Sequence, residues 1–343
     1  MGQPAMSDIL SQAESLLKKV RPASDIILCN PLSGGRNNRV YRLETTWGPL
    51  LLKKYHLGGD WDRMAAESRF LRFCETADVR RVPRLCGEDA GTGLALHTWI
   101  DGERPVPGKL SAGDMAAAAA FVGELAAASR MPDTGGMPLA RDACRSPEDM
   151  VRSLRVRLAQ LEAALLADSG GTGTAEALAF FRDWLVPAWE RTRQTLSAGV
   201  PGRNMRRRFS SRTLLASPSD FGFHNALRVA DGGLRFVDFE YAGVDSAVKL
   251  IGDFICQADY APPESVCEKL ASSVCADPIR AAELAEWVWI LLPLFRVKFC
   301  CIVLNDFKSA DAERRDFSTG ETRAERREKQ LTKAKTYFED FMK

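Results

Sequence analysis

The stretch SPSDFGFHNALRVADGGLRFVDFEYAG, from Ser217 to Gly243, decides how the rest of the chain is interpreted. Its segments NALRVA and LRFVDFE have the residue types of two short strands. The intervening DGG is typical of a three-residue hairpin turn that contains glycine. The sequence therefore predicts a hairpin in which Ala230 pairs with Leu234.

This register gathers three oxygen-bearing side chains at one end of the hairpin. Counting back from the turn places Asn225 opposite Phe239, with Asp238 diagonally beside Asn225. Asp220 lies five residues before Asn225, in the segment that enters the hairpin. One carboxylate and one amide beside a phosphate suit Mg²⁺, and a second carboxylate could orient a hydroxyl and accept its proton. The alternative is a turn whose side chains satisfy only local backbone groups, and the hairpin alone does not decide between the two.

A second polar signal lies in the segment WDRMAAESRFLRFC, which we expect to be a helix. Glu67 falls within the apolar stripe of this helix, where an unpaired carboxylate would be costly. The preceding segment LLLKKY offers Lys53 and Lys54 on opposite faces of a strand. A buried lysine–glutamate pair whose lysine reaches phosphate oxygens is one use of such an arrangement, and a purely structural ion pair is the other.

Upstream, Gly34 and Gly35 fall in a turn between two strand-like segments. Backbone amides of such a turn can bind phosphate oxygens. A single pair of glycines is a weak signal, because most such pairs belong to ordinary hairpin turns.

Composition excludes several classes of protein. The 343 residues allow two domains or lobes, and the net charge of +2 predicts no particular partner. Nine cysteines without a CxxC pair suit a reducing, cytoplasmic compartment, and three histidines without zinc-ligand spacing argue against a structural zinc site. The start of the chain lacks the apolar core of a signal peptide. The apolar run from Trp287 to Leu304 contains Pro293, Arg296 and Lys298, which favours a buried helix pair over a membrane span.

The pattern of the chain changes near residue 100. Before that point, a helical segment is followed by strand-like runs with one further helix. After it, helical periodicity dominates, and the hairpin is the main interruption. We therefore divide the chain into residues 1–98 and residues 99–343.

Taken in order, these parts resemble a known family. A glycine turn, a strand lysine, a helix glutamate, an aspartate with asparagine five residues later and a hairpin aspartate occur in the order found in the aminoglycoside phosphotransferase and choline kinase-like family. These enzymes are small-molecule relatives of protein kinases. The resemblance covers residues 27–255 and implies an α+β, two-lobed, protein-kinase-like fold. Residues 1–98 would form a nucleotide-binding lobe with an antiparallel sheet, and residues 99–343 a helical lobe with the catalytic loop and substrate site.

The resemblance also implies a role for individual residues. Lys53, held by Glu67, would contact the α- and β-phosphates of ATP, and Asp220 would face the acceptor hydroxyl. Asn225 and Asp238 would hold magnesium. Further nucleotide contacts would come from Gly34 and Gly35, and from His97 and Trp99 in the connector LHTWI, whose backbone would read adenine. Asp253 in LIGDF resembles an aspartate that braces the catalytic loop from a helix.

The catalytic loop departs from the family pattern. The family usually has histidine and glycine before the catalytic aspartate and another histidine two residues after it. Here the aspartate follows SPS, and Gly222 occupies the second histidine position. His224 is either a displaced substitute or a residue of the turn, and we favour the turn. The departure puts rate and substrate identity in doubt more than nucleotide binding.

The activity that the resemblance implies is magnesium-assisted transfer of the γ-phosphoryl group of ATP to a hydroxyl of a small molecule, such as a sugar, an amino alcohol or an aminoglycoside. A nucleotide-binding regulator without turnover is the alternative on the same fold. A protein kinase is disfavoured, because the hairpin aspartate is followed directly by a helical pattern without a long activation segment. The arginines between Arg203 and Arg212 have only Phe209 among them, so we expect neither a nucleic acid nor a membrane partner.

The charge of the acceptor can be inferred only indirectly. Relatives that bind polycationic aminoglycosides tend to use acidic pockets. Arg296 and Lys298 interrupt an apolar helix here, which favours a neutral or anionic acceptor. In the alternative interpretation, these two cations pair with carboxylates such as Glu286 or reach the surface.

Overall fold

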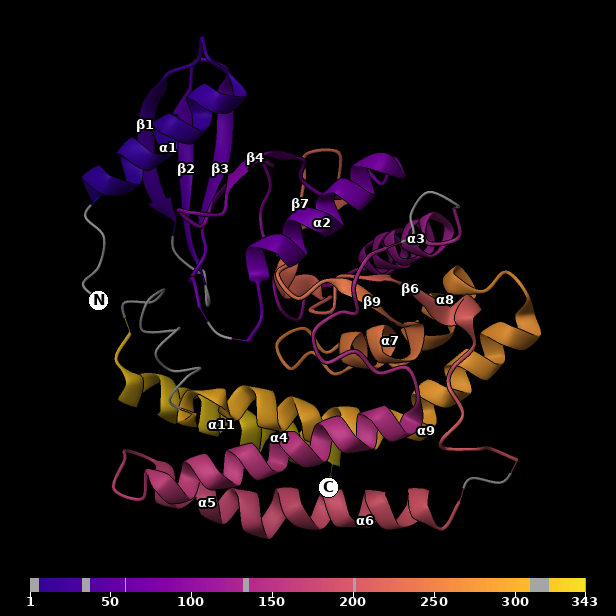
Figure 1. The fold of residues 1–343 in the computed structure, drawn as a ribbon. Helices are drawn as coiled ribbons and strands as arrows, with labels where there is room; N and C mark the ends of the chain where they lie inside the picture. The colour runs from indigo at the N-terminus through magenta and orange to yellow at the C-terminus, as the bar shows by residue number, and fades with distance from the viewer. Residues whose placement is uncertain are drawn as a thin grey trace.

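An antiparallel sheet of five strands forms one end of the molecule (Figure 1). Its strand order is β1-β2-β3-β5-β4. The computed structural model describes residues 6–32, 38–58, 60–131, 136–199, 202–308 and 321–342. The elements of this end are α1 (Met6–Val20), β1 (Ile26–Leu32), β2 (Arg39–Thr45), β3 (Gly48–Lys54), α2 (Arg63–Thr76), β4 (Leu85–Asp89) and β5 (Leu94–Thr98).

The side chains of β3 point alternately to the two faces of the sheet, and these faces have different surroundings. Leu50 and Leu52 are buried in an apolar cluster with Leu16 and Leu17 of α1, so this helix covers one face of the sheet. Lys53 points to the opposite face, where it meets α2. The sheet therefore has an apolar face that stabilises it and a second face that holds charged groups.

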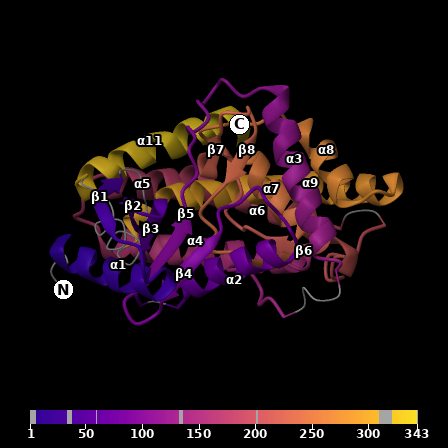
Figure 2. The ribbon, with the colours of Figure 1, turned by 90° about the horizontal axis from the view of Figure 1, so that it is seen from above.

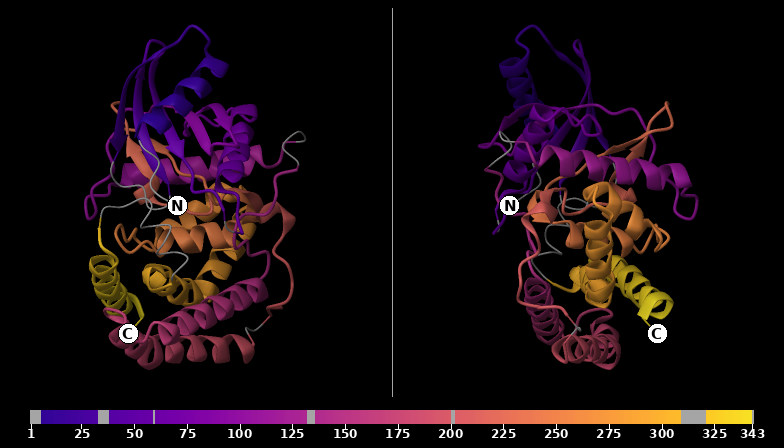
Figure 3. Two further views of the ribbon diagram at one scale, coloured as in Figure 1. Left: turned by 60° about the vertical axis from the view of Figure 1, so that its left-hand side comes forward. Right: turned by 90° about the vertical axis from the view of Figure 1, so that its right-hand side faces the viewer.

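The rest of the described chain is mostly helical. Both views of Figure 3 place this helical part at the opposite end from the sheet, and Figure 2 shows α3 and α8 on the side away from α1. Its helices are α3 (Ala112–Ala128), α4 (Pro147–Ala167), α5 (Thr174–Phe180), a π-helical turn (Phe181–Leu185), α6 (Val186–Ser197), α7 (Ala247–Ile255), α8 (Val266–Val274), α9 (Pro278–Val303), the short helix η5 (Leu304–Phe307) and α11 (Arg323–Met342).

Helix α9 is the centre of the helical part. It contacts α4, α6, α7, α8 and α11, so most of its apolar surface is covered. The expectation of a helix pair here was wrong, because α9 continues through Pro293 as one helix. Within the described residues, the segment from Pro278 to Phe307 is the one stretch long and apolar enough to cross a membrane, and 61% of its most apolar window is buried inside the protein.

Four short strands lie between the helices and carry the hairpin and its flanking segments. Strands β6 and β9 pair with each other, as do β7 and β8, and both pairs are antiparallel. A short helix, η4, precedes β7. The bounds are β6 (Leu214–Ser217), η4 (Phe223–Asn225), β7 (Ala226–Arg228), β8 (Leu234–Phe236) and β9 (Gly243–Ser246).

The hairpin exists, but its predicted register was wrong. Arg228, not Ala230, pairs with Leu234, and the amide of Val237 donates to the carbonyl of Asn225. The turn closes around Gly232, whose φ of +78° is a left-handed conformation that glycine adopts readily. Because the shift is two residues, each side chain keeps its predicted face of the ribbon.

Candidate active site

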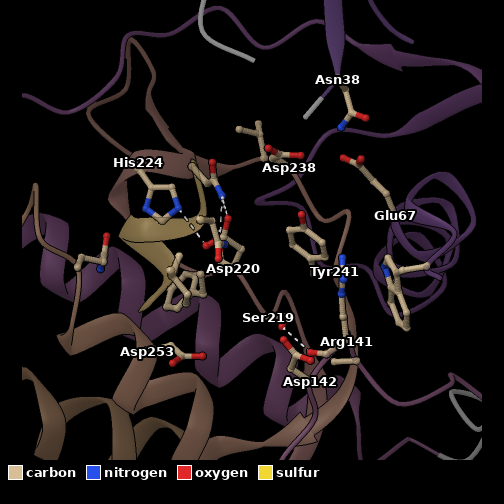
Figure 4. Close-up of a pocket in the computed structure, with 18 of the residues that line it drawn as sticks. Asn38, Glu67, Arg141, Asp142, Ser219, Asp220, His224, Asp238, Tyr241 and Asp253 are labelled. Atoms are coloured by element: carbon tan, nitrogen blue, oxygen red, sulfur yellow. Dashed lines mark hydrogen bonds and ion pairs between the residues drawn. The ribbon is translucent and has the colours of Figure 1, made fainter. Parts of the chain in front are cut away.

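One large cavity, of about 1,090 Å³, lies between the sheet and the helical part. Lys53 of β3 lines it, and so do Asp220, Asn225 and Asp238 of the hairpin region. Figure 4 shows Asp238, Glu67 and Asn38 on one side of this space, with Asp220 and His224 across from Asp238. Lys53 and Asp238, which are 185 positions apart in the chain, therefore meet in a single cleft.

Lys53 connects the sheet, α2 and the hairpin. Its Nζ lies 2.7 Å from Oε2 of Glu67 and 2.5 Å from Oδ1 of Asp238. Burial by itself lowers the pKa of the Lys53 ammonium, but the carboxylates of Asp238 and Glu67 outweigh it and hold the pKa above its usual value. The ion pair between Lys53 and Glu67 that the sequence predicts is present, and Lys53 is its cation rather than Lys54, which donates to the carbonyl of Thr92.

Glu67 is held in place from three directions. Besides Lys53, the hydroxyl of Tyr55 donates to its Oε2 at 2.6 Å, and the amide of Phe239 donates to its Oε1 at 3.2 Å. Burial acts to raise the pKa of Glu67, but the charge of Lys53 outweighs burial and the pKa lies below its usual value. The carboxylate is therefore ionised, and it fixes both Lys53 and the backbone beside Asp238.

Asp238 is the most exposed member of the cluster that it forms with Lys53 and Glu67. Its side chain is 39% exposed, whereas those of Lys53 and Glu67 are 6% and 2% exposed. It has a left-handed backbone conformation, with φ of +68°, which asparagine and aspartate tolerate better than most residues. Its carboxylate can therefore face the cleft while the neighbouring amide of Phe239 binds Glu67.

Asp220 and Asn225 are connected within the loop that precedes the hairpin. The side-chain amide of Asn225 donates to the carbonyl oxygen of Asp220 at 3.0 Å and lies 3.4 Å from its Oδ2. The amide nitrogen is used in this way, so Oδ1 is the Asn225 atom that suits a cation. The Asp220 side chain is 51% exposed and faces the cleft.

His224 does more than occupy the turn, contrary to the interpretation that we favoured. Its Nε2 lies 3.2 Å from Oδ1 of Asp220 (Figure 4). Its backbone carbonyl accepts a hydrogen bond from Arg104. A Cβ at Gly222 would lie 2.6 Å from Nδ1 of His224 and 2.3 Å from Oε1 of Gln257. The space beside Gly222 is thus filled by His224 and Gln257, which explains physically why no side chain stands at position 222.

Ser219 occupies the position where the family has glycine, and its φ is +65°. This left-handed conformation is costly for serine, by about 1 kcal/mol. The Oγ of Ser219 compensates through two contacts, a hydrogen bond to the carbonyl of Arg141 at 3.5 Å and one from Nζ of Lys249 at 3.3 Å. The loop before Asp220 is therefore held by side-chain bonds at a point where glycine needs none.

The connector after β5 also lines the cleft. His97 and Trp99 are among its lining residues, and Arg42 of β2 stacks over the ring of Trp99 at 4.7 Å. Burial lowers the pKa of His97 to about 4, so its ring is neutral. Nε2 of His97 and Nε1 of Trp99 are buried polar atoms that have no hydrogen-bond partner among the described residues. The predicted glycines Gly34 and Gly35 lie outside the described residues.

Three groups near the site were missed by sequence reasoning. The side-chain amide of Asn38 donates to Oε2 of Glu240 at 2.6 Å, which joins the first lobe to the hairpin. Arg141 stacks over the ring of Tyr241 at 5.5 Å, and its backbone amide donates to the carbonyl of Tyr241. Glu240 follows Asp238 in an apolar segment, which was the available signal; Asn38 and Arg141 lie in loops without a distinctive pattern.

The third missed group centres on Lys249, of whose partners only Asp253 was expected from the family resemblance. Its Nζ lies 3.0 Å from Asp245 and 3.2 Å from Asp253, and Lys298 of α9 lies 2.7 Å from Asp253. Asp253 thus reaches the catalytic loop through Lys249, which binds Ser219. The signal was present in the sequence, because Asp245, Lys249 and Asp253 are spaced by four residues, as helical ion pairs are.

The basis on which we inferred the charge of the acceptor was wrong. Arg296 pairs with Glu264, and Lys298 pairs with Asp253. Glu286, which the alternative named, instead binds Arg203. The two α9 cations are thus neutralised by carboxylates, and they do not indicate what the acceptor carries.

Comparison with known proteins agrees with this geometry. The profile of the phosphotransferase enzyme family (APH) matches residues 29–248, which is more than half of the chain. The chain belongs to this family. It is accordingly a phosphotransferase that acts on hydroxyl groups, and its two-lobed α+β fold is that of the kinase-like relatives. No curated protein matches the chain in sequence.

Solved structures of similar fold cover nearly the whole chain. A choline kinase from Cryptosporidium parvum is 12% identical, with a TM-score of 0.63, covering 98% of this chain and 96% of that one. A choline/ethanolamine kinase family protein from Mesorhizobium loti is 19% identical, with a TM-score of 0.56 and coverages of 98% and 95%. A spectinomycin phosphotransferase in complex with ADP and spectinomycin is 12% identical, with a TM-score of 0.52 and coverages of 95% and 98%. At these identities the likeness concerns the fold.

Proposed function

We propose that the protein transfers the γ-phosphoryl group of ATP, with magnesium, to a hydroxyl of a small molecule such as a sugar, an amino alcohol or an aminoglycoside. The observation that carries the proposal is Lys53, fixed by Glu67 and in contact with Asp238, in the same cleft as Asp220. The solved relative bound to ADP supports a nucleotide at this site.

The nucleotide side of the cleft has groups for each part of ATP. Lys53 would bind the α- and β-phosphates, and Glu67 holds its ammonium toward the cleft. His97 and Trp99 line the cleft at the connector, whose backbone would read adenine. Gly34 and Gly35, which fall between β1 and β2 in the sequence, would bind phosphate oxygens through their amides.

A magnesium ion would be held by Asp238 and Asn225. The donor set fits, because it offers one open carboxylate and one amide oxygen and leaves the remaining positions to phosphate and water. The cluster of Lys53, Glu67 and Asp238 carries one more negative than positive charge, which also favours a cation. When bound, the ion would neutralise the charge that develops on the transferring group.

Asp220 would receive the proton of the acceptor. As the acceptor oxygen forms a bond to the γ-phosphorus, the bond between that phosphorus and the departing ADP oxygen breaks, and the hydroxyl proton passes to the Asp220 carboxylate. His224 at Oδ1 and Asn225 near Oδ2 orient this carboxylate. Their contacts make His224 a positioning residue for Asp220.

The experiment is transfer of label from γ-labelled ATP, in magnesium, to a panel of sugars, amino alcohols and aminoglycosides. We expect a labelled product, and Asp220→Ala should lower its rate by about 10²–10⁴-fold. Stabilisation of the fold by ATP without turnover of any acceptor would instead indicate a nucleotide-binding regulator. We also propose a cytoplasmic location, which the nine free cysteines favour.

A further inference from the structure

The cleft extends well beyond the residues assigned to the nucleotide. Its far end is formed by α4, by the end of α9 with η5, and by α11. Arg152 and Arg157 line it from α4, Asn305 and Lys308 from the region of η5, and Lys333 from α11. These elements belong to the helical part of the chain, so this end is where an acceptor would be recognised.

Each carboxylate at this end already has a cationic partner. Within the described residues that line it, Asp142 lies 2.6 Å from Arg157, Asp149 lies 3.1 Å from Arg152, and Asp259 lies 2.5 Å from Lys333. A polycationic or quaternary ammonium acceptor needs carboxylates whose charge is not already compensated. The charges of these pairs balance, so the wall has no excess negative charge that would attract such an acceptor.

Arg157 has hydrogen-bond donors that its partner Asp142 does not use. Its side chain is 16% exposed, and Nη2 donates one hydrogen bond, to Oδ2 of Asp142. Its Nε is buried and has no hydrogen-bond partner among the described residues. A guanidinium has five N–H donors in a planar fork that matches a carboxylate or a phosphate, and burying an unused donor is costly. Asp142 uses one of these donors, and an oxyanion in the cleft would bind donors that Asp142 leaves unused.

Lys308 brings a second positive charge to the same region. Burial raises the pKa of the Cys301 thiol to about 12, and the charges of Arg157 and Lys308 oppose that rise. Both side chains also line the cleft. Helix α4 also contacts η5, which ends one residue before Lys308. The two cations come from different elements and converge on one end of the cleft.

We propose that the acceptor carries a negatively charged group, either a carboxylate or a phosphate ester, in addition to the hydroxyl that is phosphorylated, and that Arg157 binds this group. The inference rests on the proposed phosphotransferase function. It names the charge class of the acceptor, which neither family membership nor the fold determines.

The first experiment compares acceptors that differ only in charge. Glucose is paired with glucose 6-phosphate, and glucitol with gluconate, with choline and an aminoglycoside as cationic members. We expect kcat/KM to be about tenfold or more higher for the anionic member of at least one pair, because a charge-assisted contact to arginine is strong. Comparing the pair that contains glucose 6-phosphate with the pair that contains gluconate shows whether a phosphate or a carboxylate is preferred. Equal turnover within both pairs, or preference for a cationic acceptor, overturns the inference.

The second experiment changes Arg157 and a matched arginine of the same helix. Arg157→Gln should raise KM for the anionic acceptor about tenfold or more, while KM for its uncharged counterpart stays within about twofold. Arg157→Lys should restore part of the loss. Arg155→Gln is the control, because Arg155 is exposed and does not line the cleft. An equal effect of Arg155→Gln and Arg157→Gln overturns the inference.

A structural explanation must be separated from a binding one, because Arg157→Gln leaves Asp142 without its cation. The double variant Asp142→Asn with Arg157→Gln removes both charges, and we expect it to show the same rise in KM. Recovery of wild-type KM in the double variant would mean that Arg157 serves only to neutralise Asp142, which contradicts the proposal.

The proposed phosphotransferase function and the proposed negative charge of the acceptor can be disproved separately. If ATP with magnesium neither stabilises the protein nor yields ADP, the proposed function fails. If ATP binds but no acceptor of the panel reacts, stabilisation by gluconate and by inorganic phosphate is measured in the wild type and in Arg157→Gln. A thermal shift in the wild type that the variant lacks supports the inference, and equal shifts or none overturn it.

Discussion

Two buried lysines in this protein have similar surroundings and different consequences. Lys53 lies between Glu67 and Asp238, and Lys249 lies between Asp245 and Asp253. Around Lys249 the charges balance, since Lys298 adds a second cation for the two carboxylates. Around Lys53 one negative charge is left over, on a carboxylate that is 39% exposed to the cleft. The unbalanced charge beside Lys53 faces the cavity and favours ligand binding, whereas the balanced charges around Lys249 favour a structural role.

The largest effect that this comparison predicts is on stability, at Lys249. Lys249→Met would leave Asp245, whose side chain is fully buried, without its cation, and we expect the free energy of unfolding to fall by about 3–5 kcal/mol. Chemical denaturation measures the change. The double variant Lys249→Met with Asp245→Asn should recover part of it. A stability change under about 1 kcal/mol would mean that the cluster is not structural.

Lys53 should show its main effect on activity. We expect Lys53→Met to lower phosphoryl transfer by about 10²–10³-fold, as loss of one preorganised charge contact does. Lys54→Met is the matched control, because Lys54 is the next residue of β3 and contacts the carbonyl of Thr92 instead. Initial rates at saturating ATP measure the effect. Activity above a tenth of the wild-type rate would contradict the role assigned to Lys53.

Glu240, which lies near Lys53, allows the comparison of the two lysine clusters to be tested through the pH dependence of stability. Burial, followed by the charge of Asp238, raises the pKa of Glu240 from 4.5 to about 7. The folded protein therefore holds this proton more tightly than the unfolded chain, and stability falls as pH rises between these two values. Relative to Glu240→Gln, the wild type should lose about 2–3 kcal/mol over this range. Parallel stability curves for the two proteins would show that Glu240 titrates normally.

The smallest effect is expected at Ser219, which binds Lys249 with a left-handed backbone. Ser219→Gly relieves that conformation but removes two Oγ contacts, so we expect a net stability change within about 1 kcal/mol. Thermal unfolding measures it, with Ser210→Gly as a control in a loop outside the cleft. A loss of several kcal/mol would show that Ser219 is an essential member of the Lys249 cluster.

The sequence predicted the cluster around Lys53 because its members carry local signals. Glu67 interrupts an apolar helical stripe, and alternation along β3 assigns Lys53 to the face opposite Leu52. The hairpin was predicted, but its register was not. Either glycine of DGG could take the left-handed position, and the sequence does not say that Gly232 does.

The remaining site depends on contacts between distant segments. Asn38 meets Glu240 across 202 residues, and Arg157 meets Asp142 through the packing of α4. No periodicity within either segment encodes such pairs. The role of His224 was underestimated for a related reason, since its contact with Asp220 depends on space that Gly222 leaves open.

The hydrogen bond between Asn38 and Glu240 couples the contact between the two lobes to the charge of a carboxyl group close to Asp238. Burial raises the pKa of Glu240 and the charge of Asp238 adds to the rise, so a cation bound at Asp238 would lower this pKa and favour the ionised form. An ionised carboxylate accepts the Asn38 bond more strongly. Metal loading would then tighten the two lobes against each other, and we expect amide hydrogen exchange in β2, next to Asn38, to slow when magnesium is added with nucleotide.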